Sequence, residues 1–362
     1  MCDVGPIAQS VEQRTFNPWV DGSSPSGPTN YDFQTSSGFR IQTMAKILIV
    51  GGAGYIGSHL AMGFAEHGHT VKILDDLSNA HSPERLASQF EFKVNDIRNL
   101  EDDSAFYSGT DLLIHCAAKK DVEESIQNPE MYFEINTSGT SRIIDKIRQY
   151  GIPNMIFSST AAVYTGNESE LVSENDSVNP QTPYGQSKLR SEEKLASALD
   201  INSVSLRYFN VAGTTYNWFA DKYIRNVFPK FFKALQNRQS PSIFGNDYQT
   251  PDGTCIRDYV HIEDVVRAHL LMASRLTESK ICGEILNIGS GKGTSVAELY
   301  SEIKKVSHSD IDPVIASRRN GDLPRIVADI TKLQSWTGWK PTKGLSEIVS
   351  SSWDAFEAGL AR

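Results

Sequence analysis

Short apolar runs alternate with longer segments of helical character from residue 44 onward. Six five-residue runs rich in Val, Ile, Leu and Phe predict strands at 46–50, 70–74, 90–94, 111–115, 154–158 and 203–207. The segments between them are long enough to form the helical crossovers that parallel strands require. The pattern therefore predicts an α/β fold with a doubly wound parallel sheet of the Rossmann type.

The alternation becomes less regular in the second half of the chain. Long loops are expected within 212–262 and 310–330, with isolated strand-like pieces at 241–244 and 285–288. We expect two domains: residues 44–211 on the sheet, and residues 212–362 mainly in a smaller α/β lobe. Some of the later segments are expected to return to the sheet.

The first 43 residues differ from the rest in composition. They are rich in Ser, Pro, Gly, Asn and Gln and lack apolar periodicity. The stretch Gly22-Ser-Ser-Pro25 can be back-translated into the T-arm sequence common in transfer RNA genes. Residues 1–43 are therefore either a start-site artefact or a disordered tail, and the fold is expected to begin at Met44.

Charge and cysteine usage narrow the range of partners. The formal net charge is −9, so affinity for nucleic acid or an anionic membrane is not expected, and an anionic ligand needs a local cationic cluster. The four cysteines are scattered without CxxC spacing, which predicts no metal site and no disulfide framework. The chain contains no apolar run of membrane-spanning length and no signal-peptide pattern, so we expect a cytoplasmic protein.

A glycine motif directly follows the first predicted strand. It reads Gly51-Gly-Ala-Gly-Tyr-Ile-Gly57 and precedes an amphipathic helix that extends to about His67. This order of strand, glycines and helix is typical of a dinucleotide site, where the pyrophosphate lies at the helix N-terminus. The second strand ends at Asp75, whose carboxylate can accept from a ribose 2′-hydroxyl and would repel a 2′-phosphate. The motif predicts NAD and disfavours NADP.

Asp96 ends the third predicted strand and has two interpretations. Its position suits the edge of the adenine ring of the cofactor. A role as a helix N-cap is an equal alternative.

A second motif carries groups that can exchange protons. Tyr184 and Lys188 lie four residues apart and share one face of a predicted helix. A neighbouring ammonium lowers the pKa of a phenol and makes it a usable general base. A hydroxyl at the end of the preceding strand, from Thr160 or Ser159, would complete a proton path to a substrate alcohol.

These motifs together resemble the extended short-chain dehydrogenase/reductase family, most closely its UDP-glucose 4-epimerase branch. The resemblance includes Leu206-Arg-Tyr-Phe-Asn210 and extends from Met44 to the C-terminus. Its most specific part is Ile243-Phe-Gly-Asn-Asp-Tyr248 followed by Asp252-Gly-Thr-Cys-Ile-Arg257-Asp-Tyr-Val-His261. The segment between Asn210 and Asn226 is shorter than in many epimerases, and Val50 replaces the usual Thr before the glycine loop.

The resemblance implies a role for each matching residue. The catalytic set is Thr160, Tyr184 and Lys188. The cofactor set is Gly51, Gly54, Tyr55, Ile56, Gly57, Asp75, Asp76, Asn79, Asp96, Ile97, Lys120, Asn136, Tyr184, Lys188 and Tyr208, of which Tyr208 would help to close the nicotinamide pocket. The substrate set is Thr160, Asn210, Asn226, Arg257, Arg319, Asp322 and Ile326, with the two arginines on the diphosphate.

The implied reaction inverts C4 of a UDP-hexose by transient oxidation to a 4-keto sugar. Dehydratases and a decarboxylase of the same family begin with the same oxidation, but dehydratases carry an Asp-Glu pair where this chain has Ala161 and Ala162. A non-catalytic NAD-sensing protein is the alternative from another class. The resemblance also implies a homodimer through helices near 128–150 and 180–199.

Ile326 is the position that the resemblance connects with sugar size. In the family, the residue two positions after the Gly-Asp-Leu-Pro turn lies beside the sugar's C2 group, where a large Tyr excludes N-acetylated sugars. Ile326 predicts UDP-glucose and UDP-galactose as the preferred pair, with weaker turnover of N-acetylhexosamines. A core isoleucine without influence on specificity is the alternative.

Overall fold

A seven-stranded parallel sheet runs through the computed structural model, which describes residues 44–165, 170–223, 225–319 and 321–360. The predicted prefix 1–43 lies outside the described residues. The strands are β1 (Lys46–Val50), β2 (Thr70–Asp75), β3 (Glu91–Val94), β4 (Leu112–His115), β5 (Asn154–Thr160), β6 (Asn202–Tyr208) and β10 (Glu284–Ile288). Their order is β10-β6-β5-β4-β1-β2-β3, with all neighbours parallel.

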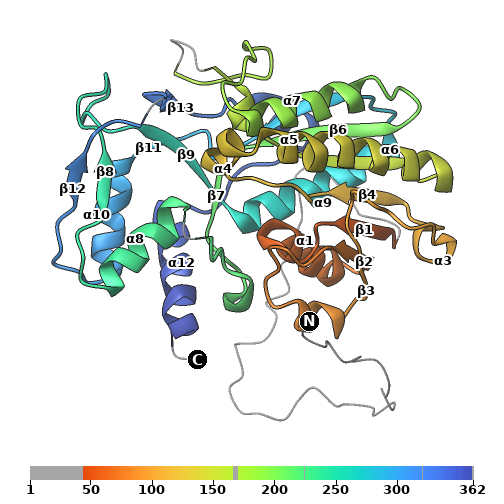
Figure 1. Ribbon diagram of the computed structural model, residues 1–362, viewed down its shortest axis with the longest axis horizontal. Coiled ribbons are helices and arrows are strands. Elements are labelled where there is room, and N and C mark those ends of the chain that lie inside the picture. The colour runs from red at the N-terminus through yellow and green to blue at the C-terminus, as the bar shows by residue number, and fades with distance from the viewer. Residues whose placement is uncertain (1–43, 166–169, 224, 320, 361–362) are drawn as a thin grey trace, which may run out of the picture. The chain divides into compact units, whose positions relative to one another are not determined.

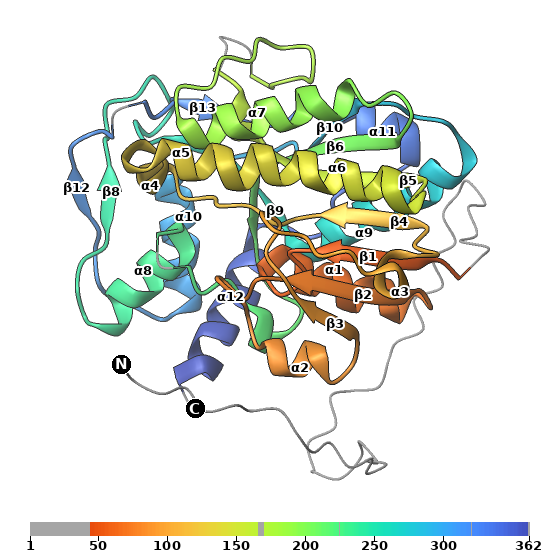
Figure 2. The same cartoon turned by 45° about the vertical axis from the view of Figure 1, so that its right-hand side comes forward.

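Helices cover both faces of this sheet (Figure 1). One face carries α4 (Val122–Gln127), α5 (Pro129–Tyr132), the π-helix η1 (Phe133–Ser138), α6 (Gly139–Tyr150) and α7 (Pro183–Ala196). The other carries α1 (Tyr55–Glu66), α9 (Ile262–Glu278) and α11 (Thr331–Thr337). The view in Figure 2 shows α6 and α7 side by side. The short helices α2 (Pro83–Ala87) and α3 (Ser104–Tyr107) flank β3, and η2 (Ala161–Val163) follows β5.

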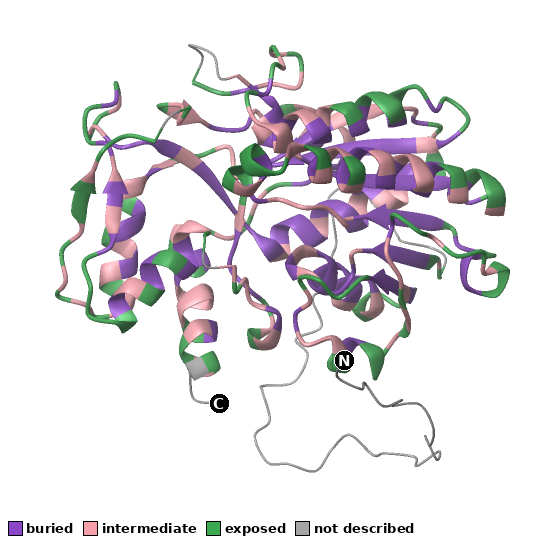
Figure 3. Ribbon diagram, viewed as in Figure 1, coloured by how far each residue is buried: buried purple, intermediate pink, exposed green. Residues whose placement is uncertain are grey.

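The strand side chains alternate between two apolar cores. Ile47 and Ile49 of β1 belong to the core under α1 and α9, whereas Leu48 and Val50 belong to the core under α6. The central strands β1, β4, β5 and β6 are therefore buried on both sides, whereas the edge strand β3 is not (Figure 3). This explains why they read as continuous apolar runs in the sequence.

The second lobe consists of two small sheets and three helices. One sheet contains β7 (Asn210–Ala212), β9 (Ile256–His261), β11 (Gly293–Ser295) and β13 (Arg325–Ile326), and the other pairs β8 (Ser242–Phe244) with β12 (Val314–Ala316). The helices are α8 (Val227–Gln236), α10 (Val296–Val306) and α12 (Leu345–Leu360), and a 3-10 turn, η3 (Asn217–Phe219), precedes α8. A third apolar core joins α8, α10 and α12.

The predicted fold class is confirmed. The spatial order β3-β2-β1-β4-β5-β6 is the one expected for a doubly wound dinucleotide-binding sheet. The smaller lobe is also α/β. The strand-like piece at 285–288 is β10, which pairs with β6 at the sheet edge. The piece at 241–244 instead forms β8 of the second lobe.

Candidate active site

The glycine loop lies at the carboxyl end of the central strand β1. Gly51 has φ +81°, and a Cβ atom there would lie 2.4 Å from the backbone nitrogen of Ala117. A Cβ at Gly57 would lie 2.1 Å from the carbonyl oxygen of Gly51. Side chains are thus excluded at both positions, because the chain after β4 packs on Gly51 and the first turn of α1 packs on the loop at Gly57.

No described side chain competes with an anionic ligand for the backbone N–H groups at the N-terminus of α1. Its N-cap residue is Gly54, no side chain caps it, and its first turn contains no acidic residue. A Cβ at Gly54 would contact only the Gly51 carbonyl oxygen, at 3.6 Å, so this face of the loop is open. Free backbone N–H groups and the positive end of the helix dipole suit a pyrophosphate. The residues present therefore fit a dinucleotide.

A cleft with an empty volume of about 860 Å³ opens beside this loop. Ten of the predicted cofactor residues line it. They are Gly51, Gly54, Tyr55, Ile56, Gly57, Asp75, Asp76, Asn79, Ile97 and Lys120. Cys116 and residues 117–119, which directly follow β4, also line the cleft.

The Asp75 carboxylate connects β2 to the glycine loop. It accepts from the backbone N–H groups of Ala53 at 2.9 Å and Leu77 at 2.8 Å. Burial raises the pKa of this carboxyl, and the two N–H donors oppose that rise. Each oxygen keeps a further lone pair, so Asp75 can still accept from a ribose hydroxyl. The exposed Asp76 binds Ser78 at the cleft rim.

Asp96 and Asn136 do not line the cleft. Asp96 begins a turn, with no described helix starting there, and its carboxylate is paired with Arg98. Asn136 is buried in the π-helix η1, where its carboxamide bonds both backbone groups of Lys119 and the Ser187 hydroxyl. Asn136 therefore fixes the cleft wall through Lys119.

Thr160, Tyr184 and Lys188 come together at the end of β5. Tyr184 and Lys188 lie on one face of α7, and Thr160 is the last residue of β5. Burial raises the pKa of Tyr184, whereas a hydrogen bond with the Thr160 side chain lowers it. The side chains of Thr160 and Tyr184 therefore lie close enough to interact, as the predicted proton path requires.

Lys188 is held close to the cofactor cleft. Its ammonium donates to the carbonyl oxygen of Ser158 at 2.7 Å, and the Ser158 hydroxyl lies 3.2 Å from the thiol of Cys116 in the cleft wall. Burial lowers the pKa of Lys188 to about 8, with opposing contributions from Cys116 and Glu192. This lysine can therefore change charge near physiological pH.

A buried ion pair between Glu192 and Arg207, outside the predicted site residues, supports the positions of Thr160, Tyr184 and Lys188. Glu192 follows Lys188 by one further helical turn, and Arg207 of β6 donates to both its oxygens, at 2.9 and 2.7 Å. Ser159 donates to the same carboxylate at 2.5 Å. The pair thus ties α7 to the ends of β5 and β6 beside Thr160. The spacing of Tyr184, Lys188 and Glu192 at i, i+4 and i+8 is the signal in the sequence.

The Tyr208 hydroxyl points into the interior and does not line the cleft. It lies 2.8 Å from Nε2 of His269 and 2.9 Å from the Ser158 hydroxyl. Nδ1 of His269 must carry a hydrogen, because it faces the carbonyl oxygen of Val265 at 2.8 Å. Tyr208 therefore donates to His269, and its contribution to the predicted site passes through Ser158, whose carbonyl binds Lys188.

Residues of the predicted substrate set lie on the second lobe. Arg257 of β9 donates to the carbonyl oxygen of Leu323 at 2.8 Å and pairs with Asp322 at 3.3 Å. Ile326 of β13 pairs with Arg257 in the strand register, so both side chains face the same side of the sheet. Ile326 also packs against the main core.

The remaining predicted substrate residues are more exposed. Arg319 is exposed and lies over the ring of Phe244. Asn226 is the N-cap residue of α8, and its carboxamide binds the Asp221 carboxylate. Asn210 is exposed at the start of β7.

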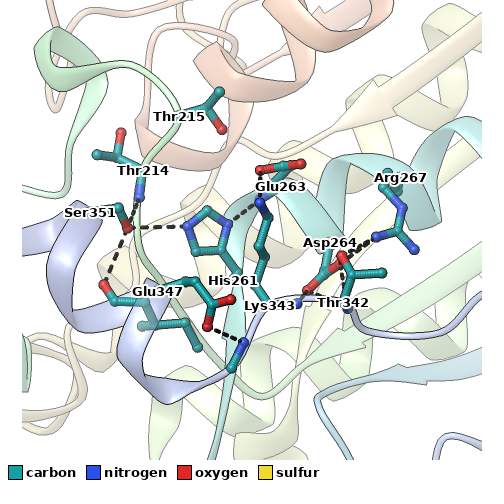
Figure 4. A network of polar contacts seen from close by, with 12 residues as sticks. Thr214, Thr215, His261, Glu263, Asp264, Arg267, Thr342, Lys343, Glu347 and Ser351 are labelled. Atoms are coloured by element: carbon teal, nitrogen blue, oxygen red, sulfur yellow. Dashed lines mark hydrogen bonds and ion pairs between the residues drawn. The ribbon is translucent and has the colours of Figure 1, made fainter. Parts of the chain in front are cut away.

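The segment after β7 bridges the cofactor cleft and α12. The Tyr55 hydroxyl donates to the carbonyl oxygen of Gly213 at 2.6 Å. Figure 4 shows that Thr214 and His261 both bond to Ser351 of α12, at 3.2 and 3.1 Å. A cleft-lining tyrosine is therefore connected to the last helix through one short segment.

Metal-ligand clusters and membrane-spanning helices are both absent from the described residues. Among residues 44–165, 170–223, 225–319 and 321–360, no group of His, Cys, Asp and Glu side chains is arranged to hold a metal ion. Within the same described ranges, no helix is both long and apolar enough to cross a membrane.

Comparisons with known proteins define the family. Residues 47–289 match the model of the NAD dependent epimerase/dehydratase family. A UDP-glucose 4-epimerase from Halalkalibacterium halodurans is 36% identical over 318 residues, which are 85% of this chain and 94% of that protein. The chain therefore belongs to the NAD dependent epimerase/dehydratase family, in its group of UDP-hexose 4-epimerases.

Solved structures agree with this assignment. The UDP-glucose-4-epimerase from Stenotrophomonas maltophila, which contains NAD and formylated UDP-arabinopyranose, has a TM-score of 0.84 at 32% identity, covering 88% of this chain and all of that one. A UDP-Glc/GlcNAc 4-epimerase from Campylobacter jejuni has a TM-score of 0.74 at 37% identity, covering 87% of this chain and 99% of that one. NAD as the cofactor, predicted from the glycine loop, is thereby confirmed. The relatives differ in the sugars they are named for.

Proposed function

We propose that this enzyme interconverts UDP-glucose and UDP-galactose, with Thr160, Tyr184 and Lys188 as its catalytic residues. The observation that carries the proposal is the approach of Thr160, the last residue of β5, to Tyr184 on α7, one helical turn from Lys188. Ser158 accepts from the Lys188 ammonium through its carbonyl oxygen. The hydroxyl of the same residue contacts the Cys116 thiol in the cleft wall. Lys188 is thus linked through Ser158 to Cys116 in the wall of the cofactor cleft.

Each residue has a separate task in the proposed reaction. Tyr184 removes the proton of the C4 hydroxyl, with Thr160 positioning that hydroxyl, and later returns the proton. NAD, when bound, supplies the redox chemistry at C4. The positive charge of Lys188 favours the phenolate form of Tyr184. The 4-keto sugar then rotates within the site. Its C4 is reduced on the opposite face, which inverts the configuration.

The turn after Thr160 favours epimerisation over elimination. Expulsion of water from the 4-keto sugar would need an additional acid and base beside it. Ala161 and Ala162, which form the turn η2, can neither donate nor accept a side-chain proton. The 4-keto intermediate is therefore expected to be reduced again.

The sugar preference is proposed from Ile326. Ile326 lies beside Arg257 in the strand register, and Arg257 is a proposed diphosphate contact. Its branched side chain leaves part of the space that an N-acetyl group at C2 would need. We expect weaker but measurable turnover of UDP-N-acetylhexosamines.

Two further features stay predictions. A homodimer would use the helices near 128–150, which are α5, η1 and α6, and near 180–199, which is α7. Figure 2 shows α6 and α7 side by side on one face of the sheet. Light scattering after gel filtration measures the mass in solution, and a mass of about one chain would contradict the dimer. A cytoplasmic location also stays a prediction.

Incubation of purified protein with UDP-galactose, without added reductant, tests the proposal. Formation of UDP-glucose is expected, and denatured protein should release NAD(H), because the cycle consumes no cofactor. Absence of conversion in protein that does contain NAD would favour the non-catalytic NAD-sensing alternative. A requirement for stoichiometric reductant would contradict the mechanism.

A further inference from the structure

Two cations from separate elements meet on one aromatic ring of the second lobe. The guanidinium carbon of Arg319 lies 3.9 Å from the centroid of the Phe244 ring, and the ammonium of Lys230 lies 5.0 Å from it. Lys230 belongs to α8, Phe244 ends β8, and Arg319 follows β12. Three elements thus converge on one point of the surface.

Neither cation is neutralised there by the described part of the chain. Neighbouring arginines have carboxylate partners, because Arg257 pairs with Asp322 and Arg318 pairs with Asp247. No described carboxylate lies within ion-pairing distance of Lys230 or Arg319. Partial burial and the charge of Arg319 lower the pKa of Lys230, and the charge of Glu123, which lies beyond ion-pairing distance, only partly opposes this. Two adjacent like charges are unfavourable unless an anion lies between them.

The start of α8 adds further donors at the same place. Lys230 lies one turn after Asn226, so the two share a face of the helix. No side chain caps this ten-residue helix, and the Asn226 carboxamide is bonded to Asp221. Pro229 has no N–H group, and the Lys230 N–H bonds the Asn226 carbonyl. The first turn therefore offers the N–H groups of Val227 and Phe228 to an anion. Lys230 therefore lies between Asn226 and Arg319, both of which were assigned to the nucleotide from the sequence.

We infer that Lys230 is a further binding residue for the diphosphate of the nucleotide sugar, acting together with Arg319. This inference rests on the proposed function, because that function supplies the diphosphate. The face of the Phe244 ring attracts both cations and so brings them to one place on the surface. Lys230 was not in the predicted set, because only the folded chain brings it beside Arg319.

The test compares Lys230→Gln with Lys233→Gln in NAD-loaded protein. Lys233 lies on the same helix, is exposed, and binds only Gln236. Calorimetric titration with UDP and with uridine separates a contact to phosphate from one to the nucleoside. Loss of a charge-assisted contact at an exposed site should raise the Kd for UDP roughly five- to tenfold in Lys230→Gln. The Kd for uridine should stay unchanged, and Lys233→Gln should match the wild type for both ligands.

Each other outcome has a definite meaning. Equal affinity of wild type and Lys230→Gln for UDP would overturn the inference. Parallel weakening for UDP and uridine would also overturn it, since it would show that Lys230 only supports the Phe244 ring. Lys230→Arg should restore UDP affinity if a cation is required. A wild type that binds NAD but not UDP would refute the proposed function itself, whereas UDP binding without a Lys230 effect would leave that function intact.

Discussion

The two halves of the candidate site are built in different ways. On the sheet side, Lys188 is buried and bound by the buried Ser158 carbonyl, and Thr160 and Tyr184 are half-buried. On the second-lobe side, the cations Lys230 and Arg319 are exposed and meet at a single aromatic ring. One half is held by hydrogen bonds inside the fold, and the other presents exposed charged side chains on the surface of the second lobe.

This difference assigns different tasks to the halves. Proton transfer needs donors and acceptors held in place before the substrate arrives, which the central sheet and α7 provide. A lobe that retains a nucleotide while the sugar turns needs adaptable charged contacts instead. Substitutions on the sheet side should therefore abolish chemistry or unfold the protein, whereas those on the lobe should change affinity and selectivity.

The largest expected effect is on the sheet side. Tyr184→Phe removes the acid/base hydroxyl and keeps the ring, so kcat should fall by about 10²–10⁴-fold, the usual contribution of a general base. The melting temperature should change little. Initial rates with UDP-galactose measure the effect, and near-normal turnover would reject Tyr184 as the base.

The buried pair of Glu192 and Arg207 gives the next largest effect. Glu192→Gln leaves the guanidinium of Arg207 buried without a counter-charge, so unfolding should become easier by about 3 kcal/mol or more. Glu193→Gln removes the same charge from an exposed neighbour and should cost less than about 0.5 kcal/mol. Denaturant titration of both variants tests this, and equal stabilities would show that the pair does not anchor α7.

Lys188 predicts a pH effect on stability. Its pKa is about 8 in the fold and about 10.4 in an unfolded chain, so between these values the unfolded state binds the extra proton and stability rises with pH. From pH 8 to 9.5 the wild type should gain about 1–2 kcal/mol relative to Lys188→Met. Lys194→Met, on the exposed face of α7, should behave like the wild type. Parallel curves for wild type and Lys188→Met would contradict the lowered pKa.

The smallest expected effect lies on the second lobe and concerns selectivity. Ile326→Tyr should lower kcat/KM for UDP-N-acetylhexosamines by roughly tenfold through steric overlap while largely sparing the hexoses. The hexose rates in the same protein serve as the control. Equal losses on both sugar types would show that Ile326 supports the core and does not limit the pocket.

The same two halves differ in how far the sequence predicts them. Buried parallel strands read as apolar runs, so β1 and β2 were predicted to within one residue, and the glycine loop was predicted with its cleft. The two-residue strand β13 gives no such pattern. Glu192 and Lys230 were missed because their partners, Arg207 and Arg319, are distant in the chain and adjacent only in the fold.

The transfer of hydrogen at C4 is the central claim, and an isotope label follows it directly. UDP-galactose carrying deuterium at C4 is incubated with the wild-type protein in ordinary water, and the UDP-glucose formed is examined by mass spectrometry and NMR. If C4 is oxidised and reduced again within one bound complex, the product keeps deuterium at C4. Deuterium found in water, in free nicotinamide cofactor or at another carbon would contradict the account.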